Sequence, residues 1–283
     1  MSGAQGAVLV VGASGGIGRA TCLALAALGR HVFAASRHPG DMHRDDASGS
    51  GAIGPLELDL CSDASISHAV KTMRSRLGPN RLSGVALCSG VGVSGPLELT
   101  DRETLHRLFD INVAGPLALV RATLPLLRES SGRIAVVGST SGRIPGAFNG
   151  AYSASKFALE AVVSVLRAEL NDSGVHVSIV DPGVIATQFW EKIAGSEAAL
   201  KARISCVDLS RYGRHFERRR RMLDDLRCFG AVPSTVSAAL THALHAGRPR
   251  RRYVVGRDAR LRLALWRLSP EWLRHRFLCR AMR

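Results

Sequence analysis

Tyr152 and Lys156 are the residues of this sequence whose types and spacing most clearly point to chemistry. On a helix, positions i and i+4 share one face, so the lysine ammonium would lie near the tyrosine phenol. An unperturbed phenol has a pKa of about 10 and is a poor acid or base near neutrality. A neighbouring cation favours the phenolate and lowers this pKa. The pair therefore predicts that Tyr152 exchanges a proton with a substrate and that Lys156 tunes it.

A serine extends this candidate site. Ser139 lies thirteen residues before Tyr152 and follows Arg133-Gly138, an apolar segment typical of a buried strand. A hydroxyl at the end of a parallel strand lies at the edge of a ligand crevice, where a substrate oxygen would be held. The tyrosine and lysine alone are also compatible with an ordinary surface helix. Together with Ser139, they predict proton exchange with a carbonyl or an alcohol.

A glycine-rich segment near the N-terminus predicts a binding site for a dinucleotide. The segment reads Gly-Ala-Ser-Gly-Gly-Ile-Gly over residues 12–18, between the apolar run Ala7-Val11 and an expected helix. Glycines let the backbone approach a pyrophosphate, which then lies at the helix N-terminus. An ordinary tight turn is the alternative. The predicted cofactor contacts here are Gly12, Ser14, Gly16, Ile17 and Gly18.

Ser36 and Arg37 follow the second expected strand and indicate which dinucleotide binds. A carboxylate at this position would accept hydrogen bonds from the adenosine ribose and repel a 2′-phosphate. Here a hydroxyl and a guanidinium can bind that phosphate instead. We therefore expect NADP(H) rather than NAD(H), although Arg37 could also be a solvated loop charge.

Short apolar strands alternate with helices along the chain, which predicts an α/β fold with a doubly wound, Rossmann-like parallel sheet. We expect one domain over residues 1–256 and a helical C-terminal extension, a basic amphipathic tail, over 257–283. Segments 38–54 and 205–230 are expected to be loops or insertions. The expected strands are Ala7-Val11, His31-Ala35, Pro55-Leu60, Gly84-Cys88, Arg133-Gly138, Val175-Val180 and Tyr253-Val255, and the expected helices are Ile17-Leu28, Ala64-Leu77, one from near Asn112, and Ala151-Asn171.

Composition places the chain among cytoplasmic proteins. The hydrophobic fraction is 46% and no run of 18 apolar residues occurs, so no transmembrane segment is expected. No signal peptide is expected at the N-terminus. The six cysteines are scattered without the Cys-x-x-Cys spacing of zinc sites, which indicates reduced thiols and no metal.

The ordered set of motifs resembles the short-chain dehydrogenase/reductase family over roughly residues 5–190, and more loosely to 256. The resemblance implies that Tyr152 exchanges the substrate proton, that Lys156 also holds the nicotinamide ribose, and that Ser139 polarises the carbonyl. It further implies a water relay to Lys156 supported by Asn112, and a homodimer or homotetramer formed through the long helices. The cofactor contacts implied in addition are Asp59 and Leu60 at the adenine, Gly90, Pro182 and Gly183, and Ile185 and Thr187 at the nicotinamide carboxamide.

Two positions depart from the family pattern together. The family usually has Thr where this chain has Val11, and Asn where it has Cys88. We expect an apolar contact between Val11 and Cys88 to replace the usual polar link, which avoids a half-satisfied buried group.

The residues around Tyr152 resemble the branch with estradiol 17β-dehydrogenase and photoreceptor retinol dehydrogenases. This resemblance implies a bulky, hydrophobic substrate such as a steroid, a retinoid or another lipid. Residues 188–230 would form a variable substrate lid. Phe189, Trp190 and Ile193, with Phe216, are candidate lining residues, although each could simply pack the lid onto the core.

Nearly all of the net charge of +15 lies in the C-terminal quarter, because residues 211–283 hold 19 arginines and five acids. In the tail, Leu261, Leu265, Leu268 and Trp272 form a helical stripe among arginines, with Pro270 dividing two short helices. Such a helix can lie on a membrane surface, or it can dock onto its own domain or a partner subunit. Nucleic-acid binding is not expected, since no recognised nucleic-acid module accompanies the basic residues.

The function expected first is therefore a nicotinamide-dependent oxidoreductase that interconverts a hydrophobic ketone or aldehyde and its alcohol. Two alternatives stay open. One is reduction of a 3-oxoacyl thioester, in which the basic tail would attract an acidic carrier protein. The other is a non-catalytic NADP-binding sensor or scaffold, which would not need Ser139, Tyr152, Lys156 and Asn112 together.

Overall fold

The structure, a computed structural model, describes residues 6–39 and 51–280. Its centre is a sheet of seven parallel strands in the order β3-β2-β1-β4-β5-β6-β7. β1 lies inside the sheet, with β2 and β3 added on one side of it and β4 to β7 on the other, which confirms the predicted doubly wound sheet. The strands are β1 (Ala7–Val11), β2 (Val32–Ser36), β3 (Ile53–Glu57), β4 (Leu82–Leu87), β5 (Arg133–Val137), β6 (His176–Pro182) and β7 (Arg252–Val255).

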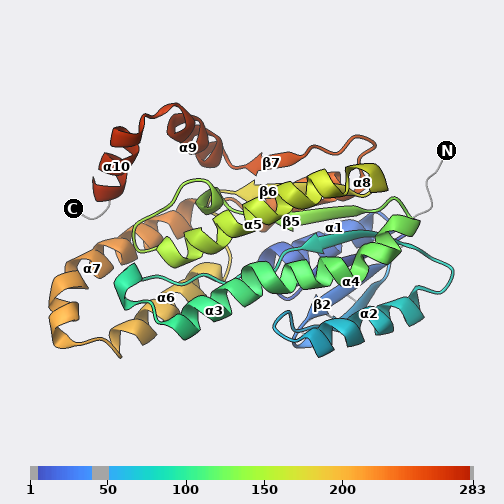
Figure 1. The fold of residues 1–283 in the computed structure, drawn as a ribbon, viewed down its shortest axis with the longest axis horizontal. Coiled ribbons are helices and arrows are strands. Elements are labelled where there is room, and N and C mark those ends of the chain that lie inside the picture. The colour runs from blue at the N-terminus through green and yellow to red at the C-terminus, as the bar shows by residue number, and fades with distance from the viewer. Residues whose placement is uncertain (1–5, 40–50, 281–283) are drawn as a thin grey trace.

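Helices cover both faces of the sheet (Figure 1). One core cluster joins the sheet to α2, α4 and α5, and the other joins it to α1 and α8. Because both faces are covered, strands such as β1 are buried along their whole length and are apolar without alternation. The helices are α1 (Gly16–Ala27), α2 (Asp63–Leu77), α3 (Arg102–Phe109), α4 (Gly115–Glu129), α5 (Gly150–Glu169), α6 (Phe189–Lys201), α7 (Cys206–Phe229), α8 (Pro233–His245), α9 (Arg257–Leu268) and α10 (Glu271–Arg280).

The helix expected from near Asn112 starts earlier and is interrupted. The chain forms α3, then a π-helical turn η4 (Asp110–Ala114), and then α4. Pro116 explains part of this irregularity, because proline has no N–H with which to close the normal bond to the carbonyl of Asn112. Pro125 lies inside α4, which nevertheless continues to Glu129.

The expectation of a loop over residues 205–230 is wrong. These residues form α7, a helix of 24 residues that begins at an N-cap in which Ser205 Oγ accepts the N–H of Asp208 at 3.1 Å. Of the other expected loop, residues 40–50 lie outside the described residues, whereas Ile53 and Gly54 belong to β3.

The expected contact between Val11 and Cys88 is also wrong. Val11 packs with the cluster on the α2, α4 and α5 side of the sheet, while Cys88 packs on the α1 and α8 side. Burial raises the pKa of Cys88 to about 12, and a hydrogen bond with Thr21 of α1 lowers it. The two strands are linked there by backbone, through the Cys88 N–H and the Val11 carbonyl at 3.0 Å.

After β7 the chain forms α9 and α10, which lie beyond the sheet (Figure 1). As the sequence predicts, Pro270 separates the two helices. Among the described residues, no helix is both long enough and apolar enough to cross a membrane.

Candidate active site

Most of the predicted site residues follow the strands at one edge of the sheet. Gly12 follows β1, Arg37 follows β2, Gly90 lies just beyond β4, and Ser139 lies just beyond β5. In a parallel sheet these carboxyl ends share one edge, where open α/β folds bind their ligands. The fold thus places a glycine loop and a candidate catalytic hydroxyl, 127 residues apart in the chain, along the same crevice.

Ser139 and Tyr152 lie next to each other, and the Ser139 hydroxyl lowers the pKa of the phenol. Ser139 caps a single 3₁₀ turn, and its Oγ accepts the N–H of Ser141 at 3.1 Å. Tyr152 lies in the first turn of α5 and is only 8% exposed. The capping bond fixes the serine oxygen beside the phenol, so one substrate oxygen could contact both hydroxyls.

Burial dominates the acidity of the tyrosine. It raises the pKa of Tyr152 to about 12, and the Ser139 hydroxyl lowers the pKa only in part. The expected lowering by Lys156 is therefore not the dominant effect. The lysine ammonium lies 5.9 Å from the centre of the phenol ring and donates instead to the carbonyl of Val137, at 3.1 Å. Tyr152 consequently keeps its proton at neutral pH.

Lys156 is itself strongly affected by burial, which lowers its pKa to about 8, while the charge of Asp181 raises it. An ammonium in this range exchanges protons near neutrality. Asp181 is fully buried in β6, and sequence reasoning missed it. A charged residue at the end of an otherwise apolar strand is the signal that could have found it.

Asn112 ties together the segments around Lys156. Its side-chain nitrogen donates to the Val91 carbonyl and to Ser155 Oγ, both at 2.9 Å, and its side-chain oxygen accepts the Val91 N–H at 2.9 Å. The amide is therefore fully occupied in joining the segment after β4 to α5. Pro116 cannot donate the usual helical hydrogen bond to the Asn112 backbone carbonyl.

Glycines of the loop pack too closely to carry side chains, and the loop leaves backbone donors at the start of α1 for a phosphate group. Gly12 has φ of +78°, and a Cβ there would lie 2.8 Å from the Ser89 N. A Cβ at Gly18 would lie 2.1 Å from the Gly12 carbonyl oxygen. The N-cap of α1, Gly15, offers no side chain to the first-turn N–H groups. Ser89 Oγ, beside the loop, is buried without a hydrogen-bond partner in the described part of the chain. These residues fit a dinucleotide.

At the expected adenosine end, Ser36 is buried and Arg37 is exposed. Ser36 Oγ donates its one proton to the His38 carbonyl at 2.9 Å, so in this arrangement the Ser36 hydroxyl can accept further hydrogen bonds but cannot donate one. Asp59 lies in the same neighbourhood as Arg37, since both charges act on the pKa of Cys61. Leu60, also predicted here, is buried in the core cluster beneath this edge.

The segment after β6 closes the other end of the crevice. Pro182 ends β6, and the Gly183 N–H donates to the Val255 carbonyl of β7 at 2.9 Å. Ile185 is buried, and Thr187 approaches the glycine loop so closely that a Cβ at Gly16 would lie 2.9 Å from its methyl carbon. The two segments expected to hold opposite parts of the dinucleotide are thus in contact.

Of the four candidate lining residues, Phe189 lies beside Tyr152, and Ile193 packs with Phe189 over Gly92. The Phe189 ring is 5.6 Å from that of Tyr152, and a Cβ at Gly92 would contact both Phe189, at 2.7 Å, and Ile193, at 3.0 Å. Trp190 instead lines a cavity of about 330 Å³ between α6 and α7, and its indole N–H donates to the Ile185 carbonyl at 2.8 Å. Phe216 is fully buried against Phe148 and anchors α7 to the core.

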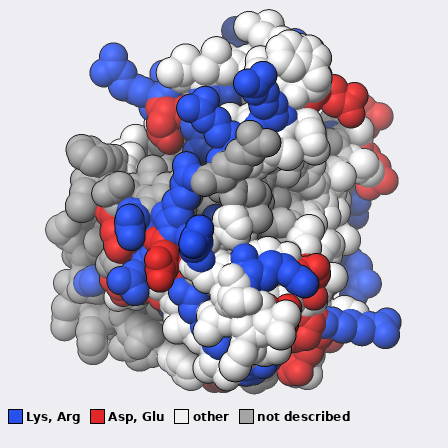
Figure 2. Space-filling view, turned by 90° about the vertical axis from the view of Figure 1, so that its left-hand side faces the viewer, with Lys and Arg blue, Asp and Glu red and all other residues white. Residues whose placement is uncertain are grey.

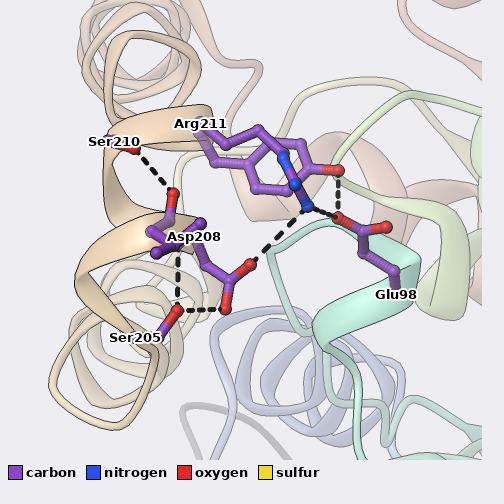
Figure 3. A network of polar contacts seen from close by, with 7 residues as sticks. Glu98, Ser205, Asp208, Ser210 and Arg211 are labelled. Carbon is purple, nitrogen blue, oxygen red and sulfur yellow. Dashed lines mark hydrogen bonds and ion pairs between the residues drawn. The ribbon is translucent and has the colours of Figure 1, made fainter.

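Polar contacts at the start of α7 hold the helix against the rest of the domain. Tyr212 donates to Glu98 at 2.5 Å, and Arg211 lies between Glu98, at 3.4 Å, and Asp208, at 3.8 Å (Figure 3). Glu98 belongs to η3 (Leu97–Leu99), which follows β4 and its loop. The helix is thus fixed at its N-terminal end by contacts with a segment more than a hundred residues away in the chain.

Fold and site together define a dinucleotide-dependent oxidoreductase with a serine, a tyrosine and a lysine around one crevice. The model of the short chain dehydrogenase family matches residues 6–198, and the chain belongs to this family, whose members act on CH–OH groups with a nicotinamide dinucleotide.

Relatives of known activity agree with this assignment. The chain is 32% identical to retinol dehydrogenase 5 of Mus musculus over 266 residues, which is 92% of this chain and 82% of that protein. It is 30% identical to 17-beta-hydroxysteroid dehydrogenase type 1 of Homo sapiens over 260 residues, 88% of this chain and 77% of that protein. A crystal structure of a short-chain dehydrogenase from Streptomyces avermitilis superposes with a TM-score of 0.72 at 26% identity, covering 93% of this chain and 92% of that one.

Proposed function

We propose that this protein is an NADP(H)-dependent oxidoreductase that interconverts a hydrophobic ketone or aldehyde and its alcohol through Ser139, Tyr152 and Lys156. The observation that carries the proposal is the position of Tyr152. Its phenol lies next to Ser139, its ring faces Phe189 of α6, and the ammonium of Lys156 lies 5.9 Å from its ring centre.

In the reductive direction, the residues of this site can supply the proton that the substrate oxygen needs. The bound cofactor supplies the hydride, and the protein supplies orientation, a proton and exclusion of water. Ser139 donates a hydrogen bond to the substrate oxygen and orients it. Tyr152, with a pKa raised to about 12, is protonated at neutral pH and gives its proton to that oxygen.

Lys156 restores the proton that Tyr152 gives up. Its pKa of about 8 allows it to hold a proton at neutral pH and to release it to a neighbouring phenolate. The backbone carbonyl of Asn112, which Pro116 cannot satisfy, would hold the water that reloads Lys156. The same ammonium would bind the ribose next to the nicotinamide.

The surroundings of Tyr152 support a hydrophobic substrate. Phe189 and Ile193 form an apolar wall over Gly92, at the side of the phenol where the substrate would enter. Residues 188–230, that is α6 and α7 with their connections, would form the lid. The printed activities of two relatives, a retinol and a steroid dehydrogenase, agree with a bulky apolar alcohol or ketone.

Exposed apolar residues on α4 and α5 support assembly into a homodimer or homotetramer through these helices. Leu117 is 39% exposed, Phe157 42% and Val165 54%. Val120 and Leu127 of α4 contribute nothing to this surface, because they are buried in the core of the same chain.

Turnover measurements test the proposed function. Hydrophobic ketones and aldehydes, and separately 3-oxoacyl thioesters, are offered with NADPH or NADH, and oxidation of the cofactor is followed. We expect turnover of a hydrophobic carbonyl with NADPH. Tyr152→Phe should lower kcat by at least about a thousandfold while NADPH binding persists, because the ring stays and only the proton donor is lost.

Two results would contradict the proposal. Turnover restricted to the thioesters would replace the substrate class. Binding of NADPH with no turnover of any carbonyl or alcohol, in wild type and Tyr152→Phe alike, would indicate a sensor.

A further inference from the structure

The two C-terminal helices form an ordered unit that packs on the domain. Ala259 and Leu263 on the inner side of α9 are buried. The ring of Trp266 contacts Phe277 of α10, with centroids 6.3 Å apart. Arg274 of α10 lies 5.5 Å from the Trp266 ring and donates to the Trp266 carbonyl at 3.0 Å, which satisfies the C-terminal end of α9.

The outer side of this unit is apolar and uncovered. Leu261, Leu265 and Leu268 of α9 are 61%, 57% and 82% exposed, and Trp272 of α10 is 65% exposed. Leu261 and Leu265 each follow a buried residue of α9, Ala259 or Leu263, by two positions, and two residues correspond to about 200° on a helix. The predicted stripe therefore faces away from its own domain, so docking onto that domain does not explain it.

Basic residues surround the outer stripe. Residues 257–280 contain seven arginines and two acids. A second basic surface adjoins α10, where Arg218 of α7 and His275, Arg276, Cys279 and Arg280 of α10 line a groove of about 770 Å³. Figure 2, which views the molecule from this end, shows many Lys and Arg side chains on this face, together with a smaller number of Asp and Glu side chains.

We infer that α9 and α10 bind the surface of a bilayer that contains anionic lipids. Exposed leucines and a tryptophan next to arginines match the two layers of such a surface, since the apolar side chains enter the acyl boundary and the arginines contact anionic headgroups. The groove of Arg218, Arg276 and Arg280 would hold such headgroups, which brings α7 close to the membrane. A lipid-soluble substrate, which dissolves in the bilayer, would then reach the protein directly from the bilayer.

The positive charge of α9 and α10 argues against a second copy of the chain as the partner that covers the apolar stripe. An isologous contact would place each tail, with its excess of arginines, against an identical one. Like charges brought together in this way repel, whereas an anionic membrane neutralises them.

Flotation with lipid vesicles tests the inference. The full-length protein is mixed with vesicles of phosphatidylcholine alone, or of phosphatidylcholine with about one third phosphatidylserine, and bound and free protein are separated. We expect binding to the anionic vesicles, weakened by salt, and little binding to phosphatidylcholine. The triple variant Leu265→Ser, Leu268→Ser, Trp272→Ser and the double variant Arg276→Glu, Arg280→Glu should each bind at least about tenfold more weakly.

Leu28→Ser is the matched control, because Leu28 is also exposed but lies at the C-terminal end of α1, outside the two C-terminal helices. It should bind as the wild type does. Thermal melts of every variant show whether it is folded, and a variant that is folded but still bound at the wild-type level overturns the inference. It is equally overturned if the wild type ignores anionic vesicles, or if the stripe variants change only self-association measured by sedimentation.

Discussion

At the scale of single residues, the site shows how burial and charge act against each other. Tyr152 and Lys156 are neighbours on one helix, yet burial moves both toward their neutral forms, with pKa values of about 12 and about 8. A neutral phenol and a lysine that titrates near neutrality suit proton donation better than proton abstraction. The spacing alone does not reveal these opposing effects of burial on the two pKa values.

The pH dependence of reduction follows from Lys156. Below its pKa of about 8 the ammonium can resupply Tyr152; above it, the protonated fraction falls about tenfold for each unit of pH. We expect kcat/KM for carbonyl reduction to be level below about pH 7.5 and to fall above about pH 8.5. Initial rates with NADPH across this range measure it. A profile that stays level to about pH 10 would show that Lys156 does not resupply the proton.

Arg37 tests the cofactor preference. The side chain is exposed after β2, and among the described residues no acid forms an ion pair with it. Arg37→Ala should raise KM for NADPH by about tenfold, the loss of one charge-assisted contact to a phosphate, and change KM for NADH by less than twofold or so. An equal change for both cofactors would mean that Arg37 does not read the 2′-phosphate.

At the scale of elements, α7 is attached to the active-site loop through a residue in an unusual conformation. Phe148 has φ of +58°, in the left-handed region, and lies four residues before Tyr152. Its ring lies 5.2 Å from that of Phe216 and 5.9 Å from that of Tyr212, both on α7. The aromatic contacts hold the backbone in a form that costs a non-glycine residue roughly 1–2 kcal/mol.

Two substitutions at Phe148 separate strain from packing. Phe148→Ala and Phe148→Gly lose the same ring contacts. Both residues can adopt the left-handed conformation, but only alanine is strained in it. We expect both variants to be less stable than the wild type, with the glycine variant more stable than the alanine variant by about 1 kcal/mol. Urea unfolding at equilibrium measures both. At an unstrained position glycine is less stable than alanine by about 0.5–1 kcal/mol. If the alanine variant at position 148 were the more stable of the two, Phe148 would not be strained.

Element boundaries show which features a sequence can predict. The apolar strands and the motif residues at their ends were predictable, because burial on both faces and a shared sheet edge require them. The third strand was predicted too late, at Pro55-Leu60, whereas β3 is Ile53–Glu57; Pro55 is tolerated within it because β3 is an edge strand. The helix α7 was missed because charge hides its short apolar series, Leu209, Tyr212 and Phe216.

At the scale of the whole molecule, one arginine of the last strand forms ion pairs with residues next to the candidate active site. Arg252 of β7 forms ion pairs with Asp181 of β6 and with Glu160 of α5, the helix that carries Tyr152 and Lys156. Asp181 in turn acts on the pKa of Lys156. Glu160 is 92 positions from Arg252 in the chain and Asp181 is 71 positions from it, so no local sequence pattern could have placed the three residues together. The last strand thereby helps to set the charge environment of Lys156.

The substitution Arg252→Met tests this connection through stability. Burial raises the pKa of Asp181, and Arg252 lowers it, so removal of the arginine leaves a fully buried carboxylate whose Oδ1 already lacks a hydrogen-bond partner. We expect a loss of about 3–5 kcal/mol near pH 7.5, measured by urea unfolding. Arg251→Met, at the exposed neighbouring position, is the control and should change stability by less than about 0.5 kcal/mol.

The sign of the pH dependence distinguishes lost charge compensation from lost packing. A carboxyl group whose pKa is higher in the folded than in the unfolded chain destabilises the fold increasingly as pH rises above its unfolded value, about 4, until it is ionised in both states. Arg252→Met raises that folded pKa further, so its deficit relative to the wild type should shrink as pH falls from about 7.5 to about 5. A deficit that is the same at both pH values would mean that Arg252 stabilises the protein by packing alone, and that Asp181 does not depend on it for its charge.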